Sequence, residues 1–417
     1  MSQSPFTSPT TRARLLNGPL SQIVPRYVAR LKRGRYSTSA AQSRLGILGH
    51  FAHWMSMCHL PIHMVDEECV DFFLRHHLPF CDCASPVDRT PGDVHAALTS
   101  LLTILRETHV IPAIPDPTGP IAEELKRYNA HMQNARGLAS GTRSGYLRTI
   151  GRFLLAKFAG RPVLISKLRP SDIHDFIDGQ LNVIDTASNA AAISSALRAY
   201  LGYRATCGDP VQPLLAAIAT PVHWGLATLP RGLTPEEVDR VLNSFTDTTP
   251  SRRRGYAIVR LGLDLGLRSI EINRLELDDI DWKRGSITLN RTKSRRQDFL
   301  PLPVETGRAL ETYILKERPK TKQRMVFVRH IAPYDQAMGV DGIRAVVRDV
   351  FRRAGIPHGR SHSLRHTLAC RLINRGSSIK EVADILRHRS LNTSLIYAKV
   401  NHDALAGVAL PWPGSSS

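Results

Sequence analysis

Acidic side chains are missing from the start of this sequence, because no aspartate or glutamate occurs before Asp66. The same stretch carries eight arginines or lysines, and the whole chain of 417 residues has 56 Lys and Arg against 36 Asp and Glu. The formal net charge is therefore +20. An excess of this size indicates a polyanionic partner, and charge alone leaves DNA, RNA and an anionic membrane open.

Long apolar runs are also missing. No run approaches the length of about 18 residues that a spanning helix needs, and the first residues lack the apolar core of a secretory signal. We therefore expect no membrane partner and a cytoplasmic location. The sequence contains no GxxxxGK[ST] loop, so we expect no nucleotide hydrolysis. It also lacks a compact carboxylate cluster of the kind that two-metal nucleases use.

Cysteine is scarce. The six cysteines are too few and too irregularly spaced for a disulfide framework, which fits a reducing compartment. Cys81 and Cys83, with His76 and His77 nearby, raise the alternative of a zinc site. The C-x-C spacing is not the usual C-x-x-C, and no second pair of ligands follows it. We therefore expect no metal and no cofactor.

The residues that can carry chemistry gather near the C-terminus. His362 and Arg365 are three residues apart, so a helix places them one turn apart on the same face. His388 follows 23 residues after Arg365, and Tyr397 follows nine residues after His388. Taken alone, each residue is more simply given a structural role, since an H-x-x-R pair usually lies on a solvated helix face and a tyrosine near a C-terminus usually fills a core. Their joint occurrence favours a site.

Two further segments lie upstream. The run from Leu265 to Glu271 reads L-G-L-R-S-I-E and contains Arg268. Residues 286–289 alternate polar and apolar as a strand does, and residues 299–302 are predicted to be the returning strand of a hairpin. Lys293 lies between the two strands, 25 residues after Arg268.

Together these residues resemble the tyrosine recombinase (phage integrase) family over roughly residues 232 to 405. The family has an arginine in a G-L-R-x-x-E segment, a lysine on a β-hairpin, an H-x-x-R pair, a following His or Trp, and a nucleophilic tyrosine. The resemblance implies the following catalytic residues: Arg268, Lys293, His362, Arg365, His388 and Tyr397.

The resemblance also implies a mechanism. The hydroxyl of Tyr397 would attack a DNA phosphate, leaving a 3′-phosphotyrosine and a free 5′-hydroxyl, while two arginines stabilise the charge of the transition state. His362 would act as general base, Lys293 would protonate the leaving oxygen, and His388 would hydrogen-bond the phosphate. No metal takes part in this chemistry.

The expected fold is mainly α, with a small antiparallel β-hairpin or sheet in an α+β catalytic domain. Apolar positions in residues 45–52 recur in 147–154, and those in 62–74 recur in 165–177, so an internal duplication is a further hypothesis. Residues 210–230 are predicted to form a linker. The predicted parts begin with a flexible basic tail (1–24) and an additional helical domain (25–113). The family resemblance implies that a SAM-like core-binding domain that clamps DNA (121–215) and an integrase-type catalytic domain (230–413) follow.

Basic residues outside the signature are interpreted as phosphate contacts. Arg143, Arg148 and Arg152 lie on the first helices of the core-binding segment, and Arg295 and Arg296 lie in the hairpin turn. The alternative is an ordinary helical bundle with a solvated basic face. The basic N-terminal stretch is likewise either an arm along DNA phosphates or a solubilising tail.

The resemblance predicts double-stranded DNA as the partner and a tetramer of the chain on that DNA. The residues after Tyr397 are expected to pack either on the next subunit or in cis, and accessory or sister recombinases are further candidate partners. The leading function is integration or transposition of a mobile element. The expected location is the cytoplasm, in association with the nucleoid. The alternatives are a chromosome-dimer resolvase, a catalytically silent architectural or excision-control protein, and a type IB topoisomerase, which shares the chemistry.

Overall fold

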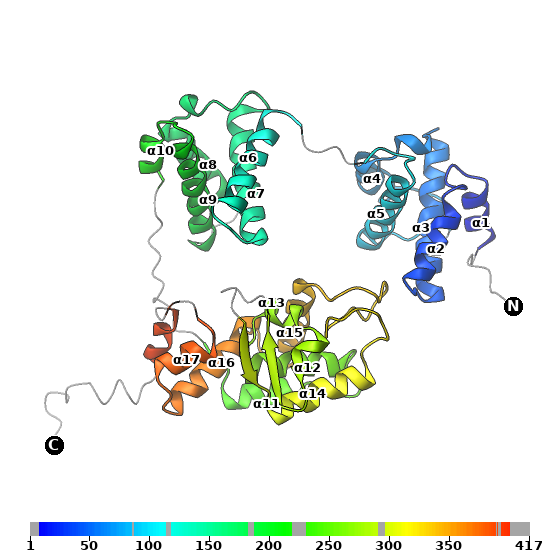
Figure 1. The fold of residues 1–417 in the computed structure, drawn as a ribbon. Helices are drawn as coiled ribbons and strands as arrows, with labels where there is room; N and C mark the ends of the chain where they lie inside the picture. The colour runs from blue at the N-terminus through cyan, green and yellow to red at the C-terminus, as the bar shows by residue number, and fades with distance from the viewer. Residues whose placement is uncertain are drawn as a thin grey trace, which may run out of the picture. The chain divides into compact units, whose positions relative to one another are not determined.

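The computed structural model describes residues 8–85, 87–113, 118–181, 187–218, 231–290, 297–388, 390 and 393–400 (Figure 1). These residues are mostly helical and include one small antiparallel sheet, which confirms the expected fold class. Contacts between Cα atoms divide the chain into two compact units, residues 112–227 and residues 1–111 with 228–417. No helix among the described residues is long and apolar enough to cross a membrane.

The N-terminal helices pack around a core of their own. The first helix begins after Ser8, whose hydroxyl accepts hydrogen bonds from two backbone amides of the first turn. Leu15 and Leu20 are fully buried beside Tyr27. The prediction of a mobile tail over residues 1–24 is therefore wrong from residue 8 onward, because the apolar side chains of this stretch complete the core. The helices of this bundle are α1 (Pro9–Leu16), α2 (Val24–Arg33), α3 (Thr38–Met57), α4 (Glu67–Phe72) with the π-helical turn η2 (Phe73–His77), and α5 (Pro91–Glu107).

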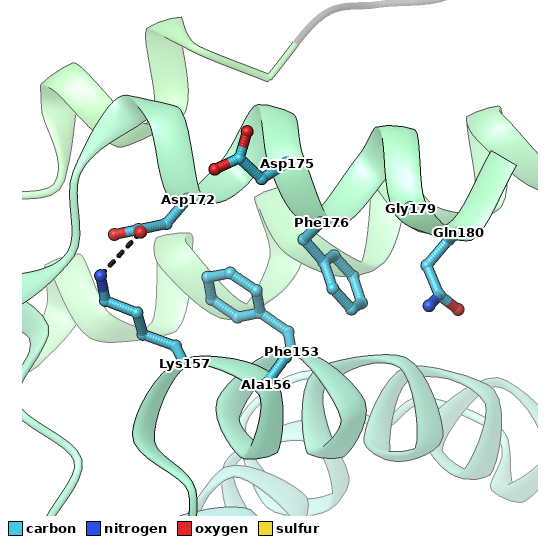
Figure 2. A pocket seen from close by; sticks show the side chains of 8 residues that line it. All are labelled: Phe153, Ala156, Lys157, Asp172, Asp175, Phe176, Gly179 and Gln180. Carbon is cyan, nitrogen blue, oxygen red and sulfur yellow. Dashed lines mark hydrogen bonds and ion pairs between the residues drawn. The ribbon is translucent and has the colours of Figure 1, made fainter. Parts of the chain in front are cut away.

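The unit formed by residues 112–227 is a second helical bundle. It consists of α6 (Pro120–Asn134), α7 (Ser140–Phe158), α8 (Pro170–Leu181), α9 (Ala187–Thr206) and α10 (Gln212–Ala216). A pocket between α7 and α8 is lined by Phe153 and Phe176, with an ion pair of 2.6 Å between Lys157 Nζ and Asp172 Oδ1 (Figure 2). Leu214 of α10 is buried in the core, so residues 210–218 belong to this bundle and not to a linker. The rest of the predicted linker, 219–230, lies outside the described residues.

The two bundles share an order of elements. In the first, a long helix (α3) is followed by a 3-10 turn, Ile62–Met64, and then by α4. In the second, α7 is followed by a 3-10 turn, Ile165–Lys167, and then by α8. The number of residues that separates matching elements is close to the number that separates the repeated apolar positions. This shared order supports the hypothesis of a duplication.

The C-terminal part combines helices with a three-stranded antiparallel sheet in the order β1-β2-β3. Ser286 pairs with Pro301 and Leu289 pairs with Asp298, so the predicted hairpin is confirmed. Its turn, residues 291–296, lies outside the described residues. The strands are β1 (Ile280–Asp281), β2 (Ser286–Leu289) and β3 (Asp298–Pro301), and the helices are α11 (Pro235–Asn243), α12 (Arg252–Asp264), α13 (Ser269–Arg274), α14 (Val304–Lys316), α15 (Val340–Arg353), α16 (Ser361–Asn374), α17 (Ile379–Ile385) and the 3-10 helix η6 (Leu395–Val400).

Helix α12 lies at the centre of this part, in contact with α14, α15 and α16. Gly262 allows α16 to come close, because a Cβ atom at this position would lie 2.8 Å from Leu364 Cδ1. The close packing of α12 and α16 brings the segment after α12 next to Arg365. Backbone that is distant in the sequence thereby becomes part of one site.

Candidate active site

The first component of the site is the turn that follows α12. Gly266 has a φ of +58°, which a residue with a side chain rarely adopts, and a Cβ atom there would lie 2.8 Å from Leu386 Cδ2. This turn directs the Gly266 carbonyl toward α16, where it accepts a hydrogen bond from Arg365 Nη1. Two residues further on, Arg268 caps the start of α13. The glycine of the G-L-R segment is thus needed for both geometry and space.

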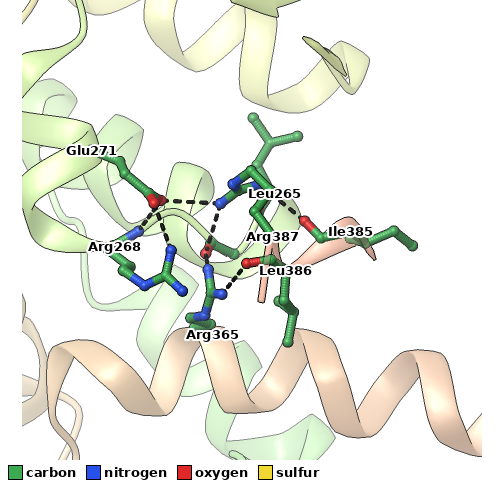
Figure 3. Close-up of polar contacts among 8 residues, drawn as sticks. Leu265, Arg268, Glu271, Arg365, Ile385, Leu386 and Arg387 are labelled. Carbon is green, nitrogen blue, oxygen red and sulfur yellow. Dashed lines mark hydrogen bonds and ion pairs between the residues drawn. The ribbon is translucent and has the colours of Figure 1, made fainter. Parts of the chain in front are cut away.

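Glu271 holds two arginines in place. Its carboxylate accepts hydrogen bonds from the Arg268 backbone N–H at 2.8 Å, from Arg268 Nη1 at 2.7 Å and from Arg387 Nη2 at 3.0 Å (Figure 3). Burial alone would raise the pKa of Glu271, but the charge of Arg387 and the bonds from Arg268 outweigh it and lower that pKa. The carboxylate is therefore ionised at neutral pH. The Arg268 side chain remains 22% exposed, so a phosphate can reach it.

Arg365 is only 4% exposed and occupies the first half of α16. Its guanidinium group donates hydrogen bonds to the carbonyl oxygens of Gly266 and Leu386. Burial, and next the charge of Arg268, lowers the pKa of Arg365 to about 9, so the group is still cationic at pH 7. The charges of Arg268, Arg365 and Arg387 act on the carboxylate of Glu271, and the carboxylate of Asp298 also acts on Arg387. Among these described residues, three cations therefore meet two carboxylates, which leaves an excess of one positive charge.

Tyr397 lies on η6, with its ring in a small core beside α16 and α17. Its hydroxyl Oη is 2.8 Å from Nδ1 of His366, within hydrogen-bond distance. The ring of His388 stacks on Tyr397, with centroids 6.4 Å apart, and its Nδ1 lies 2.6 Å from the Ser394 hydroxyl. Burial raises the pKa of Tyr397 to about 12, although the charges of Arg365 and Arg268 partly oppose this. The phenol therefore needs a base.

Both neighbouring imidazoles are neutral at pH 7. Burial, with the charge of His362 next, lowers the pKa of His366 to about 4, and burial with Arg365 does the same for His388. Burial also lowers the pKa of His362, followed by the charges of Arg365 and Arg268. A neutral imidazole at hydrogen-bond distance from a phenol can accept its proton.

The structure brings five of the six predicted catalytic residues into one region of the C-terminal part. Arg268, His362, Arg365, His388 and Tyr397 interact directly or through their charges. The sixth, Lys293, lies outside the described residues, as do Arg295 and Arg296.

Three residues of the site were not assigned a role from the sequence. His366 is four residues after His362 and so shares its helix face, Glu271 closes the G-L-R-x-x-E segment, and Arg387 directly precedes His388. The spacing of His366 and Glu271 could have indicated them. Arg387 gave no such signal, because its contacts come from a distant turn of the chain.

The predicted DNA contacts of the second bundle differ in exposure. Arg148 and Arg152 are exposed, whereas Arg143 is half-buried and donates hydrogen bonds to Asn129 and Gln133. Within the described part of the chain, none of these three arginines forms an ion pair with a carboxylate. Their charges are therefore free to attract an anion.

Comparisons with known proteins agree with this geometry. Residues 231–403 match the sequence profile of the phage integrase family. The integrase/recombinase-type protein y4rF of Sinorhizobium fredii (strain NBRC 101917 / NGR234) is 30% identical over 412 residues, covering 97% of this chain and 94% of that protein. The tyrosine recombinase XerD of Mycobacterium tuberculosis (strain ATCC 25618 / H37Rv) is 29% identical, covering 71% of this chain and 97% of XerD.

Among solved structures, the XerH site-specific recombinase bound to a palindromic difH substrate resembles this fold. The TM-score is 0.53 at 17% identity, covering 81% of this chain and 93% of that one. The two chains thus share a fold. The chain belongs to the phage integrase family of tyrosine recombinases.

Glu271 offers a test of how the site is held together. Replacing it by alanine (Glu271→Ala) leaves Arg387, whose side chain is 5% exposed, without its carboxylate. We expect the free energy of unfolding at pH 7 to fall by about 3–5 kcal/mol, as for other broken buried pairs. Since the pKa of Glu271 is lowered in the folded state, its stabilisation is present above about pH 4.3 and is lost as pH falls below that value.

Chemical denaturation at pH 7 and pH 4 measures this loss. The control is Glu305→Ala, which removes an exposed ion pair with Arg308 and should cost at most about 1 kcal/mol. Equal effects of the two substitutions would show that Glu271 is not a structural anchor of the site.

Proposed function

We propose that this chain is a site-specific DNA recombinase that acts through a 3′-phosphotyrosine, with Tyr397 as its nucleophile. The observation that carries the proposal is the 2.8 Å contact between the Tyr397 hydroxyl and His366, beside two arginines whose charges act on that phenol. A buried phenol with a base, next to an excess of positive charge, is suited to attack a phosphodiester.

In the proposed step, the oxygen of Tyr397 forms a bond to the scissile phosphorus and the 5′-oxygen leaves. Arg268 and Arg365 stabilise the charge on the non-bridging oxygens. His366 accepts the phenolic proton, a role that the family resemblance would give to His362, and His362 and His388 contact the phosphate. Lys293 remains the expected donor of a proton to the leaving 5′-oxygen. The 5′-hydroxyl of a partner strand then attacks the phosphotyrosine, which reseals the DNA.

We further propose that the chain serves a mobile element. The match to the integrase/recombinase-type protein of Sinorhizobium fredii covers 97% of this chain, including the N-terminal bundle, whereas the match to XerD covers 71%. A chromosome-dimer resolvase would not need the additional bundle. DNA is the proposed partner, with four copies of the chain on two recombining sites.

A nicked duplex from the ends of the element tests this function. Cleavage next to the nick releases a short oligonucleotide and thereby traps the protein covalently on DNA. Because the chemistry needs no metal, the same adduct should form during a brief exposure to EDTA. Exchange between two plasmid sites identifies a recombinase, while relaxation of supercoiled plasmid without exchange would favour the topoisomerase alternative. DNA binding with no adduct would favour the silent architectural protein.

The choice of base can be tested with two histidine variants. We expect His366→Ala to slow cleavage by about 10²–10⁴-fold at pH 7, because the phenol loses its proton acceptor. This deficit should shrink as pH rises toward 10, where hydroxide replaces the base. His362→Ala should instead lower the rate evenly across pH. Single-turnover cleavage between pH 6 and 10 measures both profiles, and the opposite pattern would assign the base to His362.

The second bundle is proposed to bind DNA through Arg148 and Arg152. Replacing both by alanine should weaken binding for all sequences alike, and should reduce the slope of log K against log salt by about one per lost contact. A suitable control changes Lys157→Met together with Asp172→Asn, which removes an ion pair without changing net charge. Fluorescence anisotropy at several salt concentrations measures the slopes. Equal slopes for the arginine variant and the wild type would contradict this role.

A further inference from the structure

Four potential metal ligands meet in the N-terminal bundle. His50 comes from the buried side of α3, His77 ends η2, and Cys81 and Cys83 lie in the loop that follows. One ligand atom from each residue lies within 4.8 Å of all the others. His50 is 1% exposed and Cys81 is 8% exposed, so the group is largely shielded from solvent.

The distances within the group fit a single tetrahedral ion. His50 Nε2 is 3.2 Å from His77 Nε2, and Cys81 Sγ is 3.5 Å from His50 Nε2. Cys83 Sγ is likewise 3.5 Å from His77 Nε2. Zinc bonds of about 2.0–2.1 Å to nitrogen and about 2.3 Å to sulfur imply, at tetrahedral angles, about 3.3 Å between two nitrogens and about 3.6 Å between nitrogen and sulfur.

The donor set selects the ion. Two thiolates and two imidazoles in tetrahedral arrangement are typical of zinc or of an iron–sulfur centre. In a two-iron cluster with two histidines, one iron carries both histidines and the other carries both cysteines. Here each histidine has its own cysteine at 3.5 Å, and the two histidines are also in contact. Because the histidines are not separated from the cysteines, the four ligands fit one ion.

The surroundings support the loop that bears the cysteines. Arg89 donates hydrogen bonds to the carbonyl oxygens of Leu78 at 2.9 Å and Cys81 at 2.6 Å. Phe73 contacts both rings, with centroids 5.2 Å from His50 and 5.2 Å from His77. The loop geometry is therefore fixed independently of any ion, as expected when outer contacts orient ligands.

We propose that His50, His77, Cys81 and Cys83 bind one structural zinc ion, which ties the loop between η2 and α5 to α3. All four positions are filled by protein, so the site has no open position for catalysis. The sequence argument against zinc considered a second ligand pair only after Cys83, whereas this proposal takes one ligand, His50, from far before it. His50 is 31 residues before Cys81, and His76, considered earlier, instead lies against Phe72 with centroids 4.8 Å apart.

Metal analysis of the full-length, untagged chain tests this proposal. After dialysis against a chelating resin, elemental analysis should find about one zinc per chain. Cobalt loading after acid removal of zinc should give the intense visible bands of a tetrahedral thiolate site. A mercurial reagent should release the zinc, and two of the six cysteines should react with a thiol reagent only after that release.

Variants distinguish the site from adventitious binding. Cys81→Ser and Cys83→Ser should lower zinc content at least about fivefold and abolish the cobalt bands, whereas Cys58→Ser and His76→Ala in the same bundle should retain both. If the cysteine variants fail to fold, the mercurial release and thiol protection of the wild-type chain still decide. Folded wild-type chain without zinc after growth in zinc-supplemented medium, with both thiols freely reactive, would overturn the proposal.

Discussion

Tyr397→Phe is expected to bind DNA with unchanged affinity and to form no covalent adduct. The substitution removes one oxygen atom, and the ring keeps its place in the small core beside Ile373 and Val382. Loss of a nucleophile typically reduces the rate by about 10⁴-fold or more. Gel analysis of denatured complexes on a nicked duplex measures adduct, and anisotropy measures binding.

The matched control for this variant is Tyr313→Phe, which removes a hydroxyl from a fully buried tyrosine outside the site. That variant should form adduct at close to the wild-type rate. Adduct formation by Tyr397→Phe at a similar rate would exclude Tyr397 as the nucleophile.

Arg365→Ala should have the second largest effect. One preorganised donor to a transition-state charge is worth about 2.7–4 kcal/mol, or a 10²–10³-fold loss of cleavage rate. The variant also leaves the Leu386 carbonyl without this donor, and leaves the Gly266 carbonyl with only the longer bond of 3.4 Å from Arg387 Nη2. A decrease in stability should therefore accompany the loss. Single-turnover cleavage, together with thermal melting, separates the two effects.

Two comparisons sharpen this prediction. Arg365→Lys keeps the charge but lacks the planar fork with which the guanidinium group can bind bidentately, so it should recover only part of the rate. Arg375→Ala, at the exposed end of the same helix, should cleave normally. If Arg365→Ala were folded and cleaved at the wild-type rate, the guanidinium group would have no part in the chemistry.

The sequence was most informative where local patterns determine structure. The alternation in residues 286–289 and its return predicted the hairpin, and the H-x-x-R spacing predicted one face of α16. Both rest on the periodicity of side chains along a strand or a helix, which needs no knowledge of distant contacts. The resemblance then named the residues of the site, five of which lie among the described ones.

What the sequence did not predict depends on packing between distant segments. Leu15 and Leu20 follow a stretch of polar and basic residues, so their place in a core was hidden by composition. His50 is one polar residue on an apolar helix, and only the fold brings it to Cys81. Arg387 adopts a φ of +54° and reaches a turn more than 100 residues away. None of these positions has a local signal.

Mass spectrometry of the trapped protein–DNA complex tests the central claim most directly. Digestion with trypsin after nuclease treatment should give a peptide of residues 390–399 that carries a nucleotide remnant, and fragmentation should place the remnant on Tyr397, the one tyrosine in that peptide. A remnant on any other side chain, or trapped complexes in which this peptide is always unmodified, would contradict the account.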